Sequence, residues 1–399
     1  MVIAGDGISS FKLVLFDGGC LAVRNRPRYF LTNQKITKYR PLGDLEMRCQ
    51  SYGPLTSTAH FAGLSRIAIA AALVCGCSGS NHPAPTNGSS EETGTFGSAS
   101  ESGKLNIVTT TAMVNDIVTA VAGDRAIVTG LIKGTQDPHM FTTGRNDVND
   151  MLSADAIFYT GLMLEGRMAD DFALVGRKGK PVFPVTEGLD REKLREPPEF
   201  EGHWDPHVWM NVELWSECVG QISRELGAMD SGAASDYQAR ADEYRKRLTE
   251  LDSYIRKVIA TIPKEQCYLV TAHDAFGYFA QAYGVEVKAI QGISTDSQAA
   301  ISDINSLVDF IVENKVPAIF VESSVSQKNI EAVIEGCESR GWTLKIGAEL
   351  YSDAMGDPGK YEGTYIGMMD HNATKIARAL GGEAPEKGWQ GKLSDKTEH

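Results

Sequence analysis

The sequence predicts an α/β protein with two βα lobes, each built on a parallel sheet, and one long rigid helix that joins the lobes. Three observations support this fold class. Strand and helix patterns alternate from residue 104, the alternation resumes after residue 263, and one uninterrupted amphipathic segment separates the two stretches. Strands that alternate with helices indicate βαβ units, whose strands run parallel.

The first stretch alternates short apolar runs with segments of helical periodicity. Apolar runs of strand length predict strands, and apolar residues spaced three and four apart predict helices. Strands are predicted at 105–108, 126–131 and 156–160, and helices at 113–121 and 147–152.

The second stretch repeats this pattern. Gly284 and Gly341 follow two of its helical segments, and glycine is the residue that most often ends a helix. Strands are predicted at 268–271, 285–288, 318–321 and 342–346, and helices at 275–283, 301–312 and 329–339.

The segment between the stretches carries apolar residues at alternating spacings of four and three, while most of its other positions are charged. This pattern predicts a helix with one narrow apolar stripe over 234–262, which Pro263 ends. Such a helix would be roughly 43 Å long. A coiled-coil dimer has a similar pattern, but the repeat is short and lies inside a βα chain. We therefore favour a helix packed along both lobes of its own chain, and we expect a monomer.

Composition excludes some classes of function. The chain has 399 residues, of which 42% are hydrophobic and 23% charged, as in a globular protein with room for two α/β domains. The formal net charge of -13 argues against a nucleic-acid partner, because such proteins carry a basic patch. Cys218, Cys267 and Cys337 are widely scattered, so no disulfide framework is visible and any pairing among them stays open.

The N-terminal hundred residues show the features of an export signal rather than of a folded domain. The apolar run 67–74 follows Arg66 and is too short for a membrane span, which needs about 20 residues. The sequence Val-Cys-Gly-Cys then resembles a bacterial lipobox, in which Cys77 becomes acylated because Gly76 is small at the cleavage position. Two alternatives stay open: Cys75 and Cys77 could together bind a metal ion, and the apolar run 67–74 could be a buried helix.

A polar stretch follows the lipobox. Residues 78–103 are rich in Ser, Gly, Thr, Asn, Pro and Glu, and a segment of this composition cannot bury enough surface to fold. Signal, cysteine and polar tether form the order that a membrane-anchored lipoprotein needs. A start at Met47 would give a leader of ordinary length, so residues 1–46 are predicted to be a non-native extension.

Three histidines lie in short patterns that indicate metal binding. His139 and His207 each end an Asp-Pro-His tripeptide, and His273 lies in Thr-Ala-His-Asp. His139 and His273 follow predicted strands, and ligands of open α/β sheets bind beyond the carboxyl ends of strands. A single histidine is more often a hydrogen-bonded structural residue, but two identical tripeptides are harder to explain in this way. Imidazole nitrogen is a common ligand of zinc and other first-row dications.

Asp353 is the candidate carboxylate. It follows the predicted strand 342–346 in the sequence Tyr-Ser-Asp-Ala-Met-Gly, where a turn or helix-cap residue is the alternative interpretation. Three histidines and one carboxylate would make a four-ligand site.

Residues 104 to about 382 resemble the TroA-like metal-binding lipoproteins, the solute-binding receptors of zinc, manganese and iron ABC importers. Matches over most of the mature chain are more specific than any single motif. The resemblance lies in His-Met-Phe at 139–141, Asp-Pro-His-Val-Trp at 205–209, Thr-Ala-His-Asp-Ala-Phe-Gly at 271–277 and Tyr-Ser-Asp-Ala-Met-Gly at 351–356, and in the further stretches 291–295, 320–324 and 363–368.

The resemblance implies that His139, His207, His273 and Asp353 are the metal ligands, two from each lobe, so that the metal lies in the cleft between the lobes. It implies capture of Zn²⁺ or Mn²⁺, with Fe²⁺ as a further candidate, and delivery to an ABC permease. The protein would be exported and periplasmic or cell-surface, anchored to the membrane by acylated Cys77. It would have no catalytic residues and no resident cofactor.

The predicted organisation follows from these features. It comprises the extension at 1–46, a lipoprotein signal peptide at 47–76, a flexible tether at 77–103, an N-terminal metal-binding lobe at 104–230, the linking helix at 231–263, a C-terminal metal-binding lobe at 264–385 and a polar tail at 386–399.

The choice of metal rests on one departure from the family pattern. Manganese-selective members often have glutamate at the third ligand position, where this chain has His273. Three nitrogens shift the balance toward zinc, because manganese prefers oxygen. The long His-rich loop of many zinc receptors is absent, since 197–203 is short, and His203 is interpreted as a loop residue.

A metal-dependent hydrolase that uses the same four residues is the rival interpretation. It needs a base, for which Glu322 is the nominee, although that residue could instead hydrogen-bond a loop between the lobes. Catalytic zinc sites usually keep one position open for water, so four protein ligands favour binding over hydrolysis. A surface adhesin is a third interpretation, but no repeat or aromatic-rich face supports it.

Overall fold

The structure is a computed structural model that describes residues 14–15, 21–22, 103–296 and 298–394. Of the described residues, 14–15 and 21–22 fall in one unit of the chain, and 103–296 with 298–394 fall in a second. In the first unit, β1 (Val14–Leu15) pairs with β2 (Leu21–Ala22) in antiparallel fashion. The predicted signal peptide, Cys77 and nearly all of the predicted tether lie outside the described residues. No helix in the described part of the chain is long and apolar enough to cross a membrane.

The first lobe of the second unit is built on a four-stranded parallel sheet with the strand order β4-β3-β5-β6. Parallel strands need crossover connections, and helices supply most of them here. The strands are β3 (Leu105–Thr109), β4 (Ala126–Gly130), β5 (Ala156–Tyr159) and β6 (Val182–Pro184), and the helices are α1 (Ala112–Ala122), α2 (Arg145–Ser153), α3 (Ala169–Arg177) and α4 (Val212–Met229).

The second lobe contains two parallel strand pairs. β7 pairs with β8, β9 pairs with β10, and β7 runs beside β9. The strands are β7 (Tyr268–His273), β8 (Glu286–Gln291), β9 (Ala318–Glu322) and β10 (Lys345–Leu350), and the helices are α6 (Gly277–Tyr283), α7 (Ile301–Asn314), α8 (Lys328–Ser339) and α9 (Tyr365–Ala379).

Short 3-10 turns connect several of these elements. They are η1 (Gly123–Arg125), η2 (Gly166–Met168), η3 (Arg191–Lys193), η4 (Pro198–Phe200), η5 (Val208–Met210), η6 (Ser231–Ala233), η7 (Lys264–Gln266) and η8 (Tyr361–Gly363).

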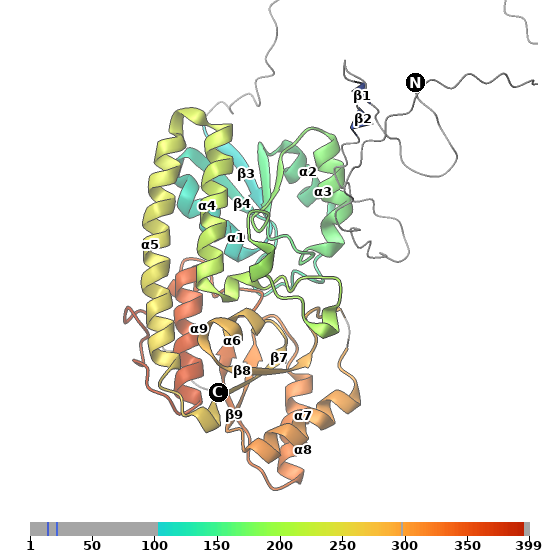
Figure 1. The fold of residues 1–399 in the computed structure, drawn as a ribbon, viewed down its shortest axis with the longest axis vertical. Coiled ribbons are helices and arrows are strands. Elements are labelled where there is room, and N and C mark those ends of the chain that lie inside the picture. Colours follow the sequence, from blue (N-terminus) through green and yellow to red (C-terminus); the bar gives the residue numbers. More distant parts are fainter. Residues whose placement is uncertain (1–13, 16–20, 23–102, 297, 395–399) are drawn as a thin grey trace, which may run out of the picture. The chain divides into compact units, whose positions relative to one another are not determined.

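One long helix, α5 (Ala234–Ile259), runs alongside both lobes (Figure 1). It packs on α1 and α4 of the first lobe and on α9 of the second. Its apolar stripe is buried from Tyr237 to Val258, as the heptad spacing predicts. The predicted fold class is thereby confirmed: two βα lobes with parallel sheets are joined by a single helix. The helix ends at Ile259, slightly before the predicted end at residue 262.

The hydrophobic core is continuous across the lobes. One large cluster of buried residues includes members of β3, α1, α4, α5, β7 and α9, and smaller clusters lie beneath α7 and α8 and between β5 and α3. Because α5 contributes to the large cluster along most of its length, it fixes one lobe against the other.

Some elements differ from the prediction. The strand predicted at 342–346 is present but begins later, since β10 runs from Lys345 to Leu350; before it, Trp342 donates to the carbonyl of Val316 and Leu344 is buried in the core. Helix α9 was not predicted; its buried residues include the polar Asp370, Asn372 and Thr374 as well as apolar ones, so polarity does not mark which of its positions are buried. Helix α4 was also missed, although its buried residues have helical spacing.

The structure also describes the state of three cysteines and the packing of the predicted polar tail. Cys218, Cys267 and Cys337 are all free thiols. Part of the predicted polar tail packs on the second lobe: Trp389 stacks near Tyr254 of α5, its backbone N–H donates to Asp370 of α9, and Leu393 is buried.

Candidate metal centre

Four side chains that the sequence nominates converge at the boundary between the lobes. Nitrogen or carboxylate atoms of His139, His207, His273 and Asp353 all lie within 4.8 Å of one another. The residues are 7%, 0%, 0% and 2% exposed, respectively. Among the residues that the structure describes, this is the one group of three or more such side chains placed to hold a metal ion.

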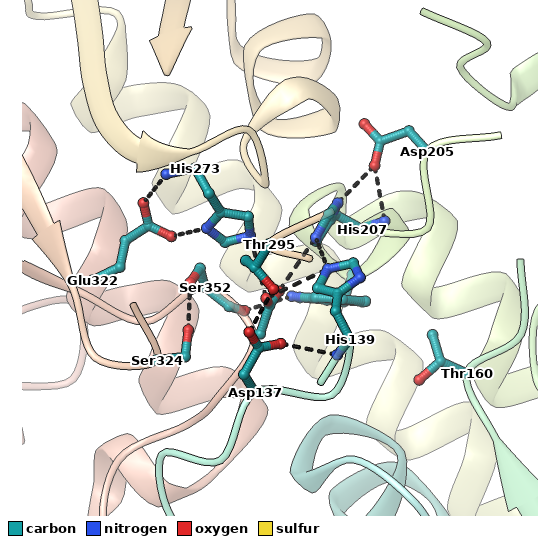
Figure 2. Close-up of polar contacts among 12 residues, drawn as sticks. Asp137, His139, Thr160, Asp205, His207, His273, Thr295, Glu322, Ser324 and Ser352 are labelled. Atoms are coloured by element: carbon teal, nitrogen blue, oxygen red, sulfur yellow. Dashed lines mark hydrogen bonds and ion pairs between the residues drawn. The ribbon is translucent and has the colours of Figure 1, made fainter. Parts of the chain in front are cut away.

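Each candidate comes from a loop or strand end that faces the other lobe. His139 lies in the loop after β4, and His207 immediately precedes η5, which leads into α4. His273 is the last residue of β7, and Asp353 lies in the loop after β10. Three of the four therefore lie at or beyond the carboxyl ends of strands, where open α/β sheets bind ligands. Figure 2 shows the rings of His139, His207 and His273 turned toward one another.

Asp353 lies against all three imidazoles. Its Oδ1 is 3.3 Å from Nε2 of His207, and its Oδ2 is 3.2 Å from Nε2 of His273 and 3.7 Å from Nε2 of His139. The Nε2 atoms of His139 and His207 are 3.3 Å apart. The Nε2 atoms of all three rings thus face one carboxylate.

Several of these atoms have no hydrogen-bond partner among the described residues. Nε2 of His273 and both carboxylate oxygens of Asp353 are buried and unpaired in this sense. The contact of 3.2 Å between them is close enough for ion pairing, but it does not have hydrogen-bond geometry. Buried polar groups without partners are costly and rare, so three at one point require an explanation. A bound cation would coordinate all three atoms.

Carboxylates on the far side of two rings orient the imidazoles. Nδ1 of His207 lies 2.8 Å from Oδ1 of Asp205, which also accepts the His207 backbone N–H. Nδ1 of His273 pairs with Glu322, which also accepts the His273 backbone N–H (Figure 2). A proton held on Nδ1 leaves the lone pair of Nε2 for a metal, as in the carboxylate–histidine pairs of metal sites. Arg195 pairs with the other oxygen of Asp205 at 2.5 Å.

His139 is held differently, by a contact that crosses between the lobes. Oδ1 of Asp137 accepts the backbone N–H of His139 at 2.8 Å. The other oxygen of Asp137 accepts the hydroxyl of Thr295, which belongs to the second lobe (Figure 2). The acidic residue of each Asp-Pro-His tripeptide therefore turns back onto the histidine that follows it, a role that the sequence pattern alone did not indicate.

The loop that carries Asp353 is fixed by residues that sequence reasoning missed. The side chain of Asn372 in α9 bonds both the N–H and the carbonyl of Tyr351. The carbonyl of Ser352 accepts the indole N–H of Trp209 at 3.0 Å. Asn372 lies inside an unpredicted helix, so no signal pointed to it; Trp209 stood in a matched motif but had no assigned role. His203, interpreted as a loop residue, lies beside Phe200, outside the group.

Burial and mutual charge interactions shift the pKa values of the three histidines and of Asp353. Burial lowers the pKa of His139 to about 4. Burial also acts to lower the pKa of His207, but the charge of Asp353 helps to outweigh it and the pKa rises to about 9. Burial opposes charge on His273 as well, yet Glu322 and Asp353 raise its pKa well above the ordinary value. Burial acts to raise the pKa of Asp353, but His273 and His207 hold it well below its usual range. The raised pKa values of His207 and His273 and the lowered pKa of Asp353 therefore share one cause, the close approach of these three groups.

Comparison with known proteins supplies independent information. The family described as Zinc-uptake complex component A periplasmic matches residues 107–379. Manganese-binding lipoprotein MntA of Bacillus subtilis is 42% identical over 272 residues, which cover 68% of this chain and 88% of that protein. Zinc-binding protein TroA of Treponema pallidum is 42% identical over 271 residues, which cover 68% of this chain and 87% of that protein.

A solved structure extends the similarity to three dimensions. The periplasmic zinc binding protein TroA from Treponema pallidum matches with a TM-score of 0.68 and 42% identity, covering 70% of this chain and 99% of that chain. The matched region contains both lobes, the linking helix and all four candidate ligands.

Proposed function

This chain belongs to the periplasmic zinc-uptake component A family, and from that premise we propose that it captures a transition-metal dication outside the cytoplasmic membrane and delivers it to an ABC permease. The observation that carries the proposal is the convergence of three imidazoles on one buried carboxylate, with three of the atoms unpaired. Such a donor set is matched to a cation.

The proposed ligands are His139 and His207 from the first lobe and His273 and Asp353 from the second. Asp205 and Glu322 would hold the protons of the Nδ1 atoms, so that Nε2 of His207 and of His273 stays free to bind metal. Because each lobe supplies two ligands, the metal would bind only where the lobes meet. Capture and release would then depend on small movements at this boundary.

The proposed cargo is zinc or manganese, with iron(II) as a further candidate. One relative is named for manganese and another for zinc, so the relatives by themselves do not choose between the two metals. Three nitrogen donors favour zinc. Asp353 presents one oxygen beside His207 and the other beside His273, and a carboxylate that binds through both oxygens suits manganese.

The geometry supports binding rather than hydrolysis at this site. Glu322, the base that a hydrolase would need, has one oxygen accepting the backbone N–H of His273 and the other paired with Nδ1 of the same ring. A carboxylate engaged in this way orients the ring and is poorly placed to activate water. The family comprises components of uptake systems, so we propose a receptor without catalytic activity.

The proposed location is the outer side of the cytoplasmic membrane, with the chain anchored through acylated Cys77 and acting as a monomer beside its permease. Relatives named as lipoproteins support the anchor. Replacing Cys77 by Ala should abolish anchoring, whereas Cys75→Ala should leave the protein in the membrane fraction. Lipid-dependent anchoring that survives Cys77→Ala would contradict this assignment.

The metal itself is tested by purifying the protein without added metal and measuring its metal content. Competition with chelators of known affinity then gives dissociation constants for Zn²⁺, Mn²⁺ and Fe²⁺. We expect one ion per chain and loss of that ion when His273 or Asp353 is replaced by Ala. Weak binding of all three ions by the wild-type protein would contradict the proposed function.

A further inference from the structure

We propose that Trp209 is a positioning residue that controls how Asp353 is presented to the metal and thereby sets the selectivity between manganese and zinc. This inference rests on the proposed function, because it concerns the same site. Trp209 is not one of the proposed ligands; it would act through two of them.

Trp209 of the first lobe forms a hydrogen bond to the second lobe next to the proposed metal site. It is fully buried in η5, two residues after His207. Its indole N–H donates to the carbonyl of Ser352 in the second lobe at 3.0 Å, and Ser352 immediately precedes Asp353. The backbone on one side of the carboxylate is therefore held by a side chain of the other lobe.

Two more contacts fix the indole and its backbone. The carbonyl of Trp209 accepts the hydroxyl of Tyr365 in α9 at 2.7 Å. The indole also packs edge-on to the ring of His207, with ring centroids 5.2 Å apart. Trp209 thus touches one proposed ligand and holds the residue beside another, so it fixes the spacing between His207 and Asp353.

This spacing matters more for manganese than for zinc. The Asp353 oxygens are divided between His207 at 3.3 Å and His273 at 3.2 Å, an orientation that offers both to one cation. Zinc is satisfied by four ligands, here three nitrogens and one oxygen, and can accept a carboxylate that has rotated. Manganese prefers oxygen donors and gains more from the second oxygen. Releasing Ser352 should therefore weaken manganese binding more than zinc binding.

The chain offers a matched control for this idea. Trp215 is also fully buried and lies close to Trp209, with ring centroids 6.4 Å apart. Its indole N–H, however, has no hydrogen-bond partner among the described residues. Trp209→Phe and Trp215→Phe remove the same atoms from neighbouring sites, but only the first removes a hydrogen bond between the lobes.

The test is a measurement of Mn²⁺ and Zn²⁺ dissociation constants by chelator competition for both variants and for the wild type. Loss of one buried hydrogen bond predicts that Trp209→Phe weakens Mn²⁺ binding about tenfold relative to Trp215→Phe. The loss for Zn²⁺ should be no more than about threefold, since the three nitrogens remain. The electron paramagnetic resonance spectrum of bound Mn²⁺ should change in Trp209→Phe only.

A second variant covers the case in which Trp209→Phe does not fold. Tyr365→Phe removes only the hydroxyl that holds the Trp209 carbonyl, and it should lower the Mn²⁺-to-Zn²⁺ affinity ratio in the same direction by a smaller factor. Equal losses for the two metals, or an Mn²⁺ affinity no lower than that of Trp215→Phe, would overturn the inference. Failure of the wild type to bind either ion would instead overturn the proposed function, so the two failures are distinguishable.

Discussion

Thr295 of the second lobe donates its hydroxyl hydrogen to Asp137 of the first lobe, and the other oxygen of Asp137 accepts the backbone N–H of His139. Beside this contact, Arg167 of the first lobe pairs with Asp296 at 2.5 Å. The loop after β8 therefore holds the loop that carries His139, which is the least buried of the four candidate ligands. Its two contacts join the lobes next to the proposed metal position.

Replacing Thr295 by Val is expected to speed metal release. The variant keeps the size of the side chain but leaves one oxygen of Asp137 without its donor, so the loop around His139 opens more often. Loss of one partly buried hydrogen bond predicts a dissociation rate about three- to tenfold faster. The rate is measured by mixing metal-loaded protein with excess chelator.

A matched control is Thr249→Val on the exposed face of α5, where the hydroxyl bonds only within its own helix. Its release rate should equal that of the wild type. An unchanged rate in Thr295→Val would show that this contact does not hold the site closed.

Metal should raise the melting temperature only when both lobes supply their ligands. Binding to the folded state stabilises it by about 4 kcal/mol at a thousandfold excess of metal over the dissociation constant. We expect His139→Ala, His273→Ala and Asp353→Ala each to lose most of this shift, whereas Asp170→Ala, at an exposed position of α3, should keep it. A full shift in both second-lobe variants would place the metal within the first lobe and rule out the cleft.

Metal affinity should fall as the pH falls, and the fall should begin above neutrality. The raised pKa values of His207, about 9, and of His273 mean that the metal-free site holds protons more tightly than free imidazole does. Metal must displace these protons, so lowering the pH from about 8 to about 6 weakens binding. The low pKa of His139, about 4, keeps that ring neutral throughout this range.

Calorimetry in buffers of different ionisation enthalpy measures the protons released. We expect at least one proton released for each metal bound near neutral pH. An affinity that does not change between about pH 8 and about pH 6 would be incompatible with imidazolium at the metal-free site.

Gly277→Ala should destabilise the protein and weaken its metal binding. A Cβ at this position would lie 1.2 Å from Nη1 of Arg195, the atom that pairs with Asp205 at 2.5 Å. Arg195 would have to move, and Asp205 would lose a partner while it still orients His207. Overpacking of this kind costs about 1–3 kcal/mol of unfolding free energy.

The control is Gly176→Ala in α3, where an added Cβ meets no atom within 4 Å. That variant should be more stable than the wild type by about 0.5–1 kcal/mol, because alanine is the better helix former. Chemical denaturation measures both changes. Equal stability of the two variants would show that Arg195 moves aside without cost.

The three histidines stood out as candidates in the sequence because chemistry and local pattern coincide in them, whereas Asp353 became a candidate ligand through the family resemblance. His139 and His207 share a tripeptide whose proline restrains the chain, and His273 ends a clear apolar strand. The long helix was equally readable, since one stripe of it is buried and the rest is charged. In both cases the signal lies within a short stretch of chain.

The partners of the ligands could not be predicted in the same way, because they depend on which strands become neighbours. Glu322 reaches His273 because β9 runs beside β7, and nothing near either residue in the sequence indicates this pairing. Asn372 reaches Tyr351 from a helix that was not predicted and in which Asn372 itself is buried. The raised pKa of His207 likewise follows from the charges of Asp353 and Asp205, which only the folded chain brings beside it.

The packing of helix α5 also determines how the protein unfolds. Its buried stripe belongs to the same core as Ile107 of β3 and Leu350 of β10, so neither lobe can unravel without exposing apolar surface of the other. Denaturation should therefore be a single cooperative transition of both lobes. Partially unfolded states that a protease could cleave should therefore be rare. A metal ion bound at the boundary between the lobes should slow proteolysis even at sites far from the ion.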